Sequence, residues 1–368
     1  MVTTWCVGLN PRSETRCWAW VGAWSRVAEM SQLPKVAVLG VGSLGKEHAR
    51  VYADLARSGL VEFAGVFDVH ADSARLHAER HGVRAFATVE EACAAVDAVS
   101  VVTPTVTHHA LARQALLAGR HVLVEKPMTE TAAQAADLVQ LAQVAGLVLQ
   151  VGHVERFNPV FRYLEEAATQ PRFIECHRLS PYPARSTDIG VVLDLMIHDL
   201  DVVLAFVKSP VVSVEAVGIS VLSKSEDIAN ARLRFANGCI ANLTASRISP
   251  ERTRKIRVFS AGPKPTYISL DYRAQEGFVY RLAAEDAQES SLLKKLLSAK
   301  DSAIVSEFAG KKIVREPVPI TKDEPLKCEL QHFVECVRER QTPRVTGAQA
   351  KVALDVAFEI VRQIGEGR

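Results

Sequence analysis

The chain has 368 residues, 48% hydrophobic and 23% charged, and this length and composition predict a globular protein of two domains. Its net charge is +2 and acidic and basic residues are interspersed, which argues against a nucleic-acid-binding surface and favours small-molecule chemistry. The seven scattered cysteines include no C-x-x-C pair, which predicts neither a disulfide framework nor a zinc site and fits the reducing cytoplasm. The apolar runs fall short of the roughly 18 residues that cross a membrane, so we expect no membrane contact.

The first 30 residues differ from the rest of the sequence. They contain all four tryptophans and show neither the apolar core of a signal peptide nor a periodic pattern. Met30 stands directly before SQLPKVAVLG, where regular structure is expected to begin. We therefore predict that residues 1–30 are a disordered extension or the result of a start codon assigned too early.

Strands alternate with helices over residues 31–153. Residues 35–40, KVAVLG, form a short apolar run that ends in glycine, which is typical of a buried parallel strand. The same reasoning predicts a helix over 43–57, a strand over 61–68, a helix over 70–82 closed by Gly82, a strand over 96–104, a helix over 109–118, a strand over 121–127, a helix over 129–145 and a strand over 147–153. This alternation predicts right-handed βαβ units in a doubly wound parallel sheet.

The rhythm changes after residue 153. Period-2 segments over 211–220, 228–247 and 255–262, with a turn at Ala236–Gly238, predict a large and mainly antiparallel sheet. The polar segment 283–303 is expected to be an exposed excursion, and helices are expected over 324–340 and after Gly347. Residues 154–368 therefore form a predicted α+β domain with a large, mainly antiparallel open sheet.

A G-x-G-x-x-G motif lies between the first strand and the first helix. Gly40 allows a tight turn, Gly42 lets the backbone approach a pyrophosphate, and Gly45 lets helix and strand pack closely. Asp68, which ends the next strand, can accept the ribose hydroxyls and would repel a 2′-phosphate, so the pattern predicts NAD as cofactor rather than NADP. The cofactor-binding residues expected in this region are Gly40, Gly42, Ser43, Leu44, Gly45 and Asp68.

Two later strands of this domain also end in polar residues. Because open parallel sheets bind ligands at the carboxyl ends of their strands, we expect these residues to contact the cofactor and Lys126 to face the site. They are Thr103, Pro104 and His108 after one strand, and Glu125 and Lys126 at the end of the next.

The apolar stretch VVLDLMIHDLDVVLAFV, residues 191–207, carries four polar side chains. In a helix, Asp194, His198 and Asp201 share one face, and Asp199 lies off it. A polar stripe on so apolar a helix indicates that this face lines a site. Asp201 is expected to be a supporting hydrogen-bond acceptor.

Together, the glycine loop, the "TP" followed by His108, AGRHVLVEKP and DLMIHDLD resemble the Gfo/Idh/MocA oxidoreductases, from about Leu33 to the C-terminal helices. The resemblance implies that Lys126, Asp194 and His198 form the catalytic set. Many members have glycine where this chain has Met196, which affects local backbone packing but not the three reactive side chains.

Within the family, residues 151–159, 175–199, 227–249 and 254–259 are most similar to members that oxidise the 3-hydroxyl of UDP-N-acetylglucosamine. Those members supply a 3-keto sugar for amination on the way to a diamino lipid A. A nucleotide diphosphate needs cations, so Arg156 and Arg178 are expected to bind substrate together with Lys126, Asp194 and His198, and Arg185 and Arg247 lie in the same segments. Family members also commonly form dimers or tetramers through the antiparallel sheet.

The implied reaction oxidises a secondary alcohol by hydride transfer to nicotinamide. His198 is the expected base, because an imidazole titrates near neutrality, and Lys126 would hydrogen-bond the same oxygen and stabilise its developing negative charge. Asp194 could either orient the imidazole or bind a sugar hydroxyl.

Several alternatives remain open at the level of sequence. The substrate could be another UDP-sugar, an inositol or a free sugar, or the chain could be a non-catalytic NAD-dependent sensor. His198 could be a structural histidine, or Asp194, His198 and Asp201 could bind a divalent cation, although hydride transfer to NAD needs no metal and we expect none. His153, Cys176 and Cys239 are expected to be structural.

Overall fold

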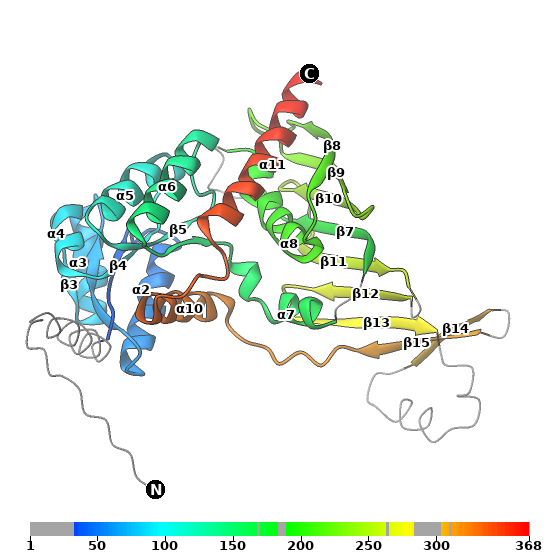
Figure 1. The fold of residues 1–368 in the computed structure, drawn as a ribbon, viewed down its shortest axis with the longest axis horizontal. Helices are drawn as coiled ribbons and strands as arrows, with labels where there is room; N and C mark the ends of the chain where they lie inside the picture. The colour runs from blue at the N-terminus through cyan, green and yellow to red at the C-terminus, as the bar shows by residue number, and fades with distance from the viewer. Residues whose placement is uncertain are drawn as a thin grey trace, which may run out of the picture. The chain divides into compact units, whose positions relative to one another are not determined.

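A parallel sheet of six strands forms the first half of the fold, in the order β3-β2-β1-β4-β5-β6 (Figure 1). The computed structural model describes residues 33–167, 170–182, 189–262, 265–282, 303–308 and 311–367. The strands are β1 (Lys35–Leu39), β2 (Glu62–Phe67), β3 (Arg84–Ala85), β4 (Ala98–Val101), β5 (His121–Glu125) and β6 (Leu149–Gly152). Their apolar, largely β-branched side chains are buried on both faces, as expected of a sheet covered by helices.

Five helices connect these strands. They are α2 (Gly45–Arg57), α3 (Ala71–His81), α4 (Val89–Ala95), α5 (Thr105–Leu117) and α6 (Ala132–Ala145). Gly82 closes α3 in the left-handed conformation with φ of 65°, as the sequence predicts. Helix α5 begins at Thr105 rather than at the predicted residue 109, because the chain turns into the helix directly after Pro104.

The second sheet has nine strands in the order β14-β15-β13-β12-β11-β7-β10-β9-β8, and it is antiparallel apart from the β7–β10 pair. Strands β9 and β10 form the predicted hairpin, and Gly238 in its turn has φ of 82°. The strands are β7 (Pro171–Leu179), β8 (Val211–Ile219), β9 (Ile228–Phe235), β10 (Ile240–Ser246), β11 (Thr253–Ser260), β12 (Thr266–Asp271), β13 (Glu276–Leu282), β14 (Ala303–Phe308) and β15 (Lys311–Pro317).

Helices cover one face of the second sheet and form a shared core with it. The core includes Val203 of α8, Leu243 of β10, Ile256 of β11 and Ile360 of α11. The helical elements in and beside this region are η1 (Val154–Phe157), α7 (Pro159–Glu166), the π-helical turn η2 (Val192–Met196), α8 (Ile197–Val207), α10 (Pro325–Glu339) and α11 (Gly347–Glu366). The sequence predicts both sheet types, and the mixed α/β architecture is confirmed.

The C-terminal helices pack across the predicted boundary at residue 153. Phe333 of α10 belongs to the same core as Val36 of β1, and Leu354 of α11 packs with Val124 of β5. The division at residue 153 stays a prediction, and the end of the chain completes the core of the first sheet. The predicted extension at residues 1–30 and most of the predicted excursion at 283–303 lie outside the described residues.

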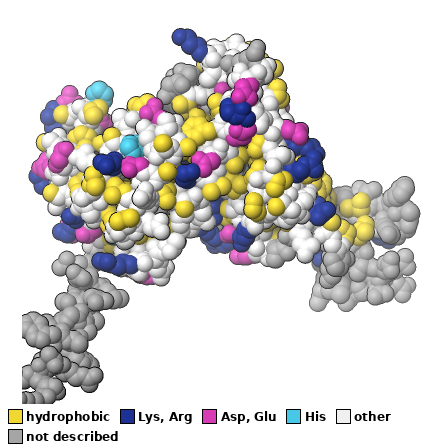
Figure 2. Space-filling model, turned by 45° about the horizontal axis from the view of Figure 1, so that its top comes forward, with side chains coloured by type: hydrophobic (Ala, Val, Ile, Leu, Met, Phe, Trp, Pro, Cys, Tyr) yellow, Lys and Arg dark blue, Asp and Glu magenta, His cyan; other side chains and the backbone are white. Residues whose placement is uncertain are grey.

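No helix among the described residues is long and apolar enough to cross a membrane. Basic and acidic side chains lie interspersed among apolar ones on the face of the molecule that Figure 2 shows. This surface agrees with the small net charge of the sequence.

Candidate active site

The glycine loop joins β1 to α2 at the carboxyl edge of the parallel sheet. Gly40 has φ of 92°, and a Cβ there would lie 2.5 Å from the carbonyl oxygen of Val102. A Cβ at Gly45 would lie 1.9 Å from the carbonyl oxygen of Gly40, so the loop and helix can pack this closely only with glycine at both positions. Ser43 and Leu44 are exposed at the amino end of α2.

The outer side of this loop is open and is flanked by a carboxylate. A Cβ at Gly42 would meet no atom within 4 Å. Asp68 follows β2, and its side chain accepts hydrogen bonds of 2.9 Å from the main-chain N–H groups of Val41 and His70. Open space at the amino end of a helix, with an acid held beside it, fits the pyrophosphate and ribose of NAD.

The turn after β4 lies against the glycine loop. Thr103 Cγ2 is 2.8 Å from the position of a Cβ at Gly40, and Pro104 directly precedes α5. His108 is buried, and its two ring nitrogens lie 2.8 Å from the carbonyl oxygen of Thr103 and 2.9 Å from that of Pro127. Both nitrogens face carbonyl groups, so His108 holds these two loops together, and the cofactor contact that the sequence predicts for His108 stays a prediction.

Glu125 at the end of β5 points into the interior. Its Oε1 lies 3.0 Å from Nε2 of the buried His48 on α2, and a Cβ at Gly152 would lie 2.6 Å from the same carboxylate. Burial raises the pKa of Glu125, but the hydrogen bond with His48 and the charges of His48 and Lys126 outweigh this effect, and the pKa lies below its ordinary value. The residue is 6% exposed and its carboxylate is bonded from the interior, so the predicted cofactor contact of Glu125 stays a prediction.

Lys126, the next residue, is bound to Asp194 of the π-helical turn η2. Its ammonium donates to the carbonyl oxygen of Asp194 at 2.7 Å and to the Oδ1 atom of Asp194 at 3.1 Å. Both side chains are 17% exposed, so the pair is accessible to solvent. The carboxylate of Asp194 holds the lysine, and the two roles that the sequence left open for Asp194 stay predictions.

His198 lies one turn further on, in the first turn of α8, and is partly exposed. Its Nδ1 atom is buried and has no hydrogen-bond partner within the described ranges, and its ring lies edge-on to the buried His153, with 6.5 Å between centroids. Burial lowers the pKa of His198 well below its ordinary value, and the positive charges of Lys126, Arg178 and Arg254 lower it further. The imidazole is therefore neutral at pH 7 and able to accept a proton.

Arg178 is paired with carboxylates in the interior. It is 3% exposed and donates to both carboxylate oxygens of Asp199, at 2.9 and 3.0 Å, and to Oε1 of Glu155 at 3.1 Å. Its predicted role in substrate binding stays a prediction, and its hydrogen bonds are made to interior carboxylates. Asp199, off the predicted stripe, is the counter-ion of this buried arginine.

Arg156 is likewise buried, with 5% exposure. Its Nη1 lies 3.4 Å from Oδ1 of Asp201, its Nη2 donates to the carbonyl oxygen of Arg344, and its guanidinium lies over the ring of Phe161. The predicted substrate contact of Arg156 likewise stays a prediction. Asp201 acts as the acceptor that the sequence predicts, although toward an interior arginine.

The remaining cations differ in accessibility. Arg247 is fully buried and forms an ion pair of 2.9 Å with Asp227, and Arg185 lies outside the described residues. Arg254 of β11 was not singled out from the sequence, yet its side chain is 53% exposed and lies 3.7 Å from Oε1 of Glu155. The alternating pattern of this strand predicts on which face of the sheet a side chain lies. It does not predict which residues from other elements surround that side chain, so it did not identify Arg254.

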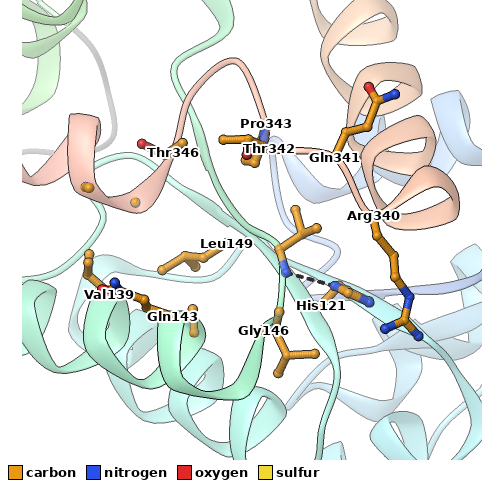
Figure 3. A pocket seen from close by; sticks show the side chains of 15 residues that line it. His121, Val139, Gln143, Gly146, Leu149, Arg340, Gln341, Thr342, Pro343 and Thr346 are labelled. Atoms are coloured by element: carbon orange, nitrogen blue, oxygen red, sulfur yellow. Dashed lines mark hydrogen bonds between the residues drawn. The ribbon is translucent and has the colours of Figure 1, made fainter.

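A groove of about 490 Å³ lies elsewhere, between α6, β6 and the segment before α11 (Figure 3). It is lined by His121 and Leu149, the first residues of β5 and β6, and His121 accepts a hydrogen bond of 2.9 Å from the N–H of Val148. The groove therefore opens at the amino edge of the sheet, opposite the edge that carries Lys126.

Other kinds of site find little support in the described part of the chain. No group of three or more His, Cys, Asp or Glu side chains there is arranged to hold a metal ion. Cys176 and Cys239 are buried free thiols, and burial raises the pKa of each.

A glycine loop with an acid beside it, and a lysine at the sheet edge that is bound to an aspartate close to a histidine, are typical of an NAD-dependent oxidoreductase that acts on CH–OH groups. Two family models match the chain: "Oxidoreductase family, NAD-binding Rossmann fold" over residues 34–153 and "GFO/IDH/MocA C-terminal domain" over residues 165–261. The chain belongs to the Gfo/Idh/MocA oxidoreductase family, as its resemblance implies.

Individual relatives agree with this assignment. A UDP-N-acetylglucosamine 3-dehydrogenase of Acidithiobacillus ferrooxidans is 35% identical over 89% of this chain and 96% of its own, and a solved structure of that enzyme has a TM-score of 0.79, covering 90% of this chain and 97% of its own. The scyllo-inositol 2-dehydrogenase (NAD(+)) of Bacillus subtilis is 25% identical over 92% and 96% of the two chains. GenD2 from gentamicin A biosynthesis, solved in complex with NAD, shares the fold, with a TM-score of 0.72 and 22% identity over 98% of each chain.

Proposed function

We propose that this protein oxidises the 3-hydroxyl of UDP-N-acetylglucosamine to a ketone with NAD. The observation that carries the reaction type is the Lys126–Asp194 ion pair beside a neutral His198 at the carboxyl edge of an NAD-binding sheet. Similarity to a 3-dehydrogenase of this sugar over nearly the whole chain supports the substrate.

Lys126 binds and polarises the reacting oxygen. Its ammonium has three N–H groups, and two of them are directed at Asp194. The third is available for the sugar hydroxyl, where a fixed positive charge stabilises the negative charge that develops as the proton leaves. Asp194 is a positioning residue, because it fixes the direction of the lysine.

His198 accepts the hydroxyl proton. Its Nδ1 is enclosed, so Nε2 is the nitrogen that takes the proton in this mechanism. A pKa well below 6.5 keeps the base unprotonated at pH 7, and it also favours release of the proton after each turnover. NAD, when bound, supplies the carbon that accepts the hydride.

The cofactor residues follow from the loop geometry. Gly40–Gly45, including Ser43 and Leu44, would receive the pyrophosphate, Asp68 the adenosine ribose, and Thr103 and Pro104 the part of the cofactor nearer to Lys126. The predicted division of the chain, with NAD bound by residues 31–153 and the sugar by the rest, agrees with these positions.

The wider role follows from the product. A 3-keto nucleotide sugar is a substrate for amination, as in the synthesis of diamino lipid A, and reduced free cysteines support a cytoplasmic location. We also propose a homo-oligomer, dimer or tetramer, through the outer face of the nine-stranded sheet. In support, a ladder of partly exposed aromatic rings crosses this face, from Phe173 through Phe259 and Tyr267 to Tyr280, with centroids 4.6 to 5.6 Å apart.

A panel of substrates tests the proposal. Protein and NAD are incubated with UDP-N-acetylglucosamine, UDP-glucose, scyllo-inositol or glucose, NADH formation is followed, and the product of each active reaction is identified by NMR. We expect turnover of UDP-N-acetylglucosamine with a ketone at C3, also after dialysis against EDTA. Turnover of scyllo-inositol alone would replace the substrate and keep the reaction, in line with the inositol dehydrogenases among the relatives. NAD binding without any turnover would instead favour a sensor.

A further inference from the structure

We propose that Arg254 and Arg273 bind the diphosphate of a nucleotide-sugar substrate beside His198 and the Lys126–Asp194 pair. This inference rests on the proposed function and names the cations that it requires. The arginines expected from the sequence, Arg156 and Arg178, are buried and already paired.

Strand geometry places Arg254 on the face of the sheet that carries α8. In β11 the side chains of Ile256 and Val258 are buried in the core shared with α8, and residues two apart lie on the same face. Arg254 therefore lies on this face too, directly across from Arg178 on β7. It differs from Arg178 in that its side chain is 53% exposed.

The two arginines share one carboxylate unequally. Oε1 of Glu155 accepts a hydrogen bond from Arg178 at 3.1 Å, whereas Nη1 of Arg254 lies 3.7 Å from the same oxygen, beyond a normal hydrogen bond. Asp199 is engaged by Arg178 through both of its oxygens. The guanidinium of Arg254 thus keeps most of its hydrogen-bonding capacity, which is directed toward solvent.

Arg273 adds a second accessible cation. It lies in the turn after β12, next to Tyr272, whose N–H donates to the carbonyl oxygen of Arg254 at 2.8 Å. Arg273 is exposed, and its side chain forms no ion pair with any residue in the ranges that the structure describes. Burial lowers the pKa of Arg254. The charges of Arg178 and Arg273 lower it further, whereas Glu155 and Asp199 raise it, so Arg273 lies within electrostatic reach of Arg254.

This positive charge acts on the catalytic base. Arg254 is one of the groups that lower the pKa of His198, so it lies within electrostatic reach of the imidazole. In a nucleotide sugar the diphosphate is attached at C1, across part of one sugar ring from the C3 hydroxyl that His198 would deprotonate. A cation within electrostatic reach of the base, with Arg273 within reach of that cation, therefore suits a substrate whose anionic group lies close to the reacting carbon. An uncharged inositol would have no use for these cations, so they favour a nucleotide sugar.

Substitution of the two arginines tests the assignment. The variants are Arg254→Gln and Arg273→Gln, with Lys255→Gln as the matched control, because Lys255 is exposed and follows Arg254 on the same strand but lies on the opposite face. We expect Arg254→Gln to raise KM for UDP-N-acetylglucosamine about 10- to 100-fold and to leave kcat within about threefold. Arg273→Gln should raise KM less, and Lys255→Gln should leave it unchanged. Arg254→Lys should recover only part of the affinity, since lysine cannot form a bidentate contact.

Binding of UDP alone, measured by calorimetry, separates this inference from the proposed function. If the wild type turns over UDP-N-acetylglucosamine and both arginine variants match it in KM and in Kd for UDP, the inference is wrong and the function stands. If the wild type turns over no UDP-sugar but binds UDP, and Arg254→Gln weakens that binding, the anion site is supported and the function is wrong. A wild type that does not bind UDP overturns the anion site. The Kd for NAD should be the same in every variant, and Arg273→Gln, in an exposed turn, keeps the test decisive if Arg254→Gln folds poorly.

Discussion

Two ion pairs in this protein involve aspartates only five residues apart in the sequence. Asp194 pairs with Lys126 where both side chains are 17% exposed, whereas Asp199 pairs with Arg178 where the exposures are 6% and 3%. The first pair leaves one lysine N–H for a ligand, while the second uses both aspartate oxygens and a further carboxylate, Glu155. Similar chemical groups on one helical segment therefore have different functions.

The difference follows from what surrounds each pair. A charge in the interior must be matched by partners, because its removal from water costs several kcal/mol. Arg178 and Asp199 meet that condition and are fixed in place. Lys126 and Asp194 remain in contact with solvent, so a substrate can replace water there. Exposure and unused hydrogen-bonding capacity, rather than charge, separate the reacting pair from the structural one.

Removal of the lysine should have the largest effect. Lys126→Met takes away the cation at the reacting oxygen, and we expect kcat/KM to fall by about 10²- to 10³-fold while NAD still binds. Because Lys126 also lowers the pKa of His198, the acid limb of the remaining activity should move to higher pH than in the wild type. Steady-state rates against pH measure both effects.

The control for this variant is Lys351→Met, which breaks an exposed ion pair with Asp355 on α11 and should leave the rates unchanged. In the wild type, the low pKa of His198 should keep kcat/KM flat from neutral pH down past pH 6.5. An acid limb in Lys126→Met that coincides with that of the wild type would show that the two side chains do not interact as proposed.

The buried pair should control stability instead. Arg178→Met leaves Asp199 and Glu155 without their cation, and we expect a loss of about 3–5 kcal/mol in the free energy of unfolding. Asp194→Asn should cost about 1 kcal/mol, because solvent reaches the pair and Lys126 keeps its hydrogen bond to the main chain. Urea denaturation of both variants compares them directly.

The double variant Arg178→Met/Asp199→Leu provides the control. It removes one buried anion together with the cation, so it should be more stable than Arg178→Met alone. Equal losses in Arg178→Met and Asp194→Asn would mean that exposure does not distinguish the two pairs.

Much of the first domain could be predicted from sequence. The G-x-G-x-x-G motif and Asp68 define a loop whose geometry depends on the backbone, and local sequence specifies backbone geometry well. Lys126 was likewise assigned correctly to the sheet edge, since the carboxyl end of a parallel strand has a fixed position. The contact of Glu125 with His48 could not be predicted, because His48 lies 77 residues away and strand position does not give side-chain direction.

The second domain was predictable in architecture but not in its arginines. Nothing local distinguishes the buried Arg178 from the exposed Arg254, which face each other across two strands. Their difference arises from Glu155 and Asp199, which come from other elements and form hydrogen bonds with Arg178, whereas Arg254 lies 3.7 Å from Glu155. Contacts between segments that are distant in the sequence determine which arginine is buried and paired. A local sequence pattern carries no information about such contacts.

Asp68 is a further carboxylate that can be compared with the two pairs. Its oxygens accept from main-chain N–H groups and no side-chain cation is paired with it within the described ranges, so it can meet a ribose hydroxyl. Asp68→Ser should shift the ratio of kcat/KM for NADP over NAD about 10- to 100-fold toward NADP, because the repulsion of a 2′-phosphate disappears. Steady-state kinetics with both cofactors measure the ratio. An unchanged ratio would mean that Asp68 does not reach the ribose.

Glu329 on α10 is a useful contrast with Asp199, because it is a buried carboxyl that has no paired cation in the described part of the chain. It is 0% exposed, and neither carboxylate oxygen has a hydrogen-bond partner in the part of the chain that the structure describes. Burial raises the pKa of Glu329 well above 4.5, and the negative charges of Glu125 on β5 and Asp201 on α8 raise it further. Glu329 in turn contributes to the raised pKa of Tyr52 on α2. We therefore expect a protonated carboxyl at pH 7.

The raised pKa of Glu329 makes the free energy of unfolding depend on pH. Above the unfolded pKa near 4.5 the unfolded chain loses a proton that the folded chain keeps, so stability falls as pH rises toward the folded pKa, by up to about 1.4 kcal/mol per pH unit. Glu329→Gln removes this term while it keeps the shape of the side chain. The variant should match the wild type near pH 4 and exceed it by about 1–3 kcal/mol at pH 7 in urea denaturation. A variant that is less stable than the wild type at pH 7, or a difference that does not change with pH, would mean that Glu329 is ionised in the fold and matched by a partner, as Asp199 is.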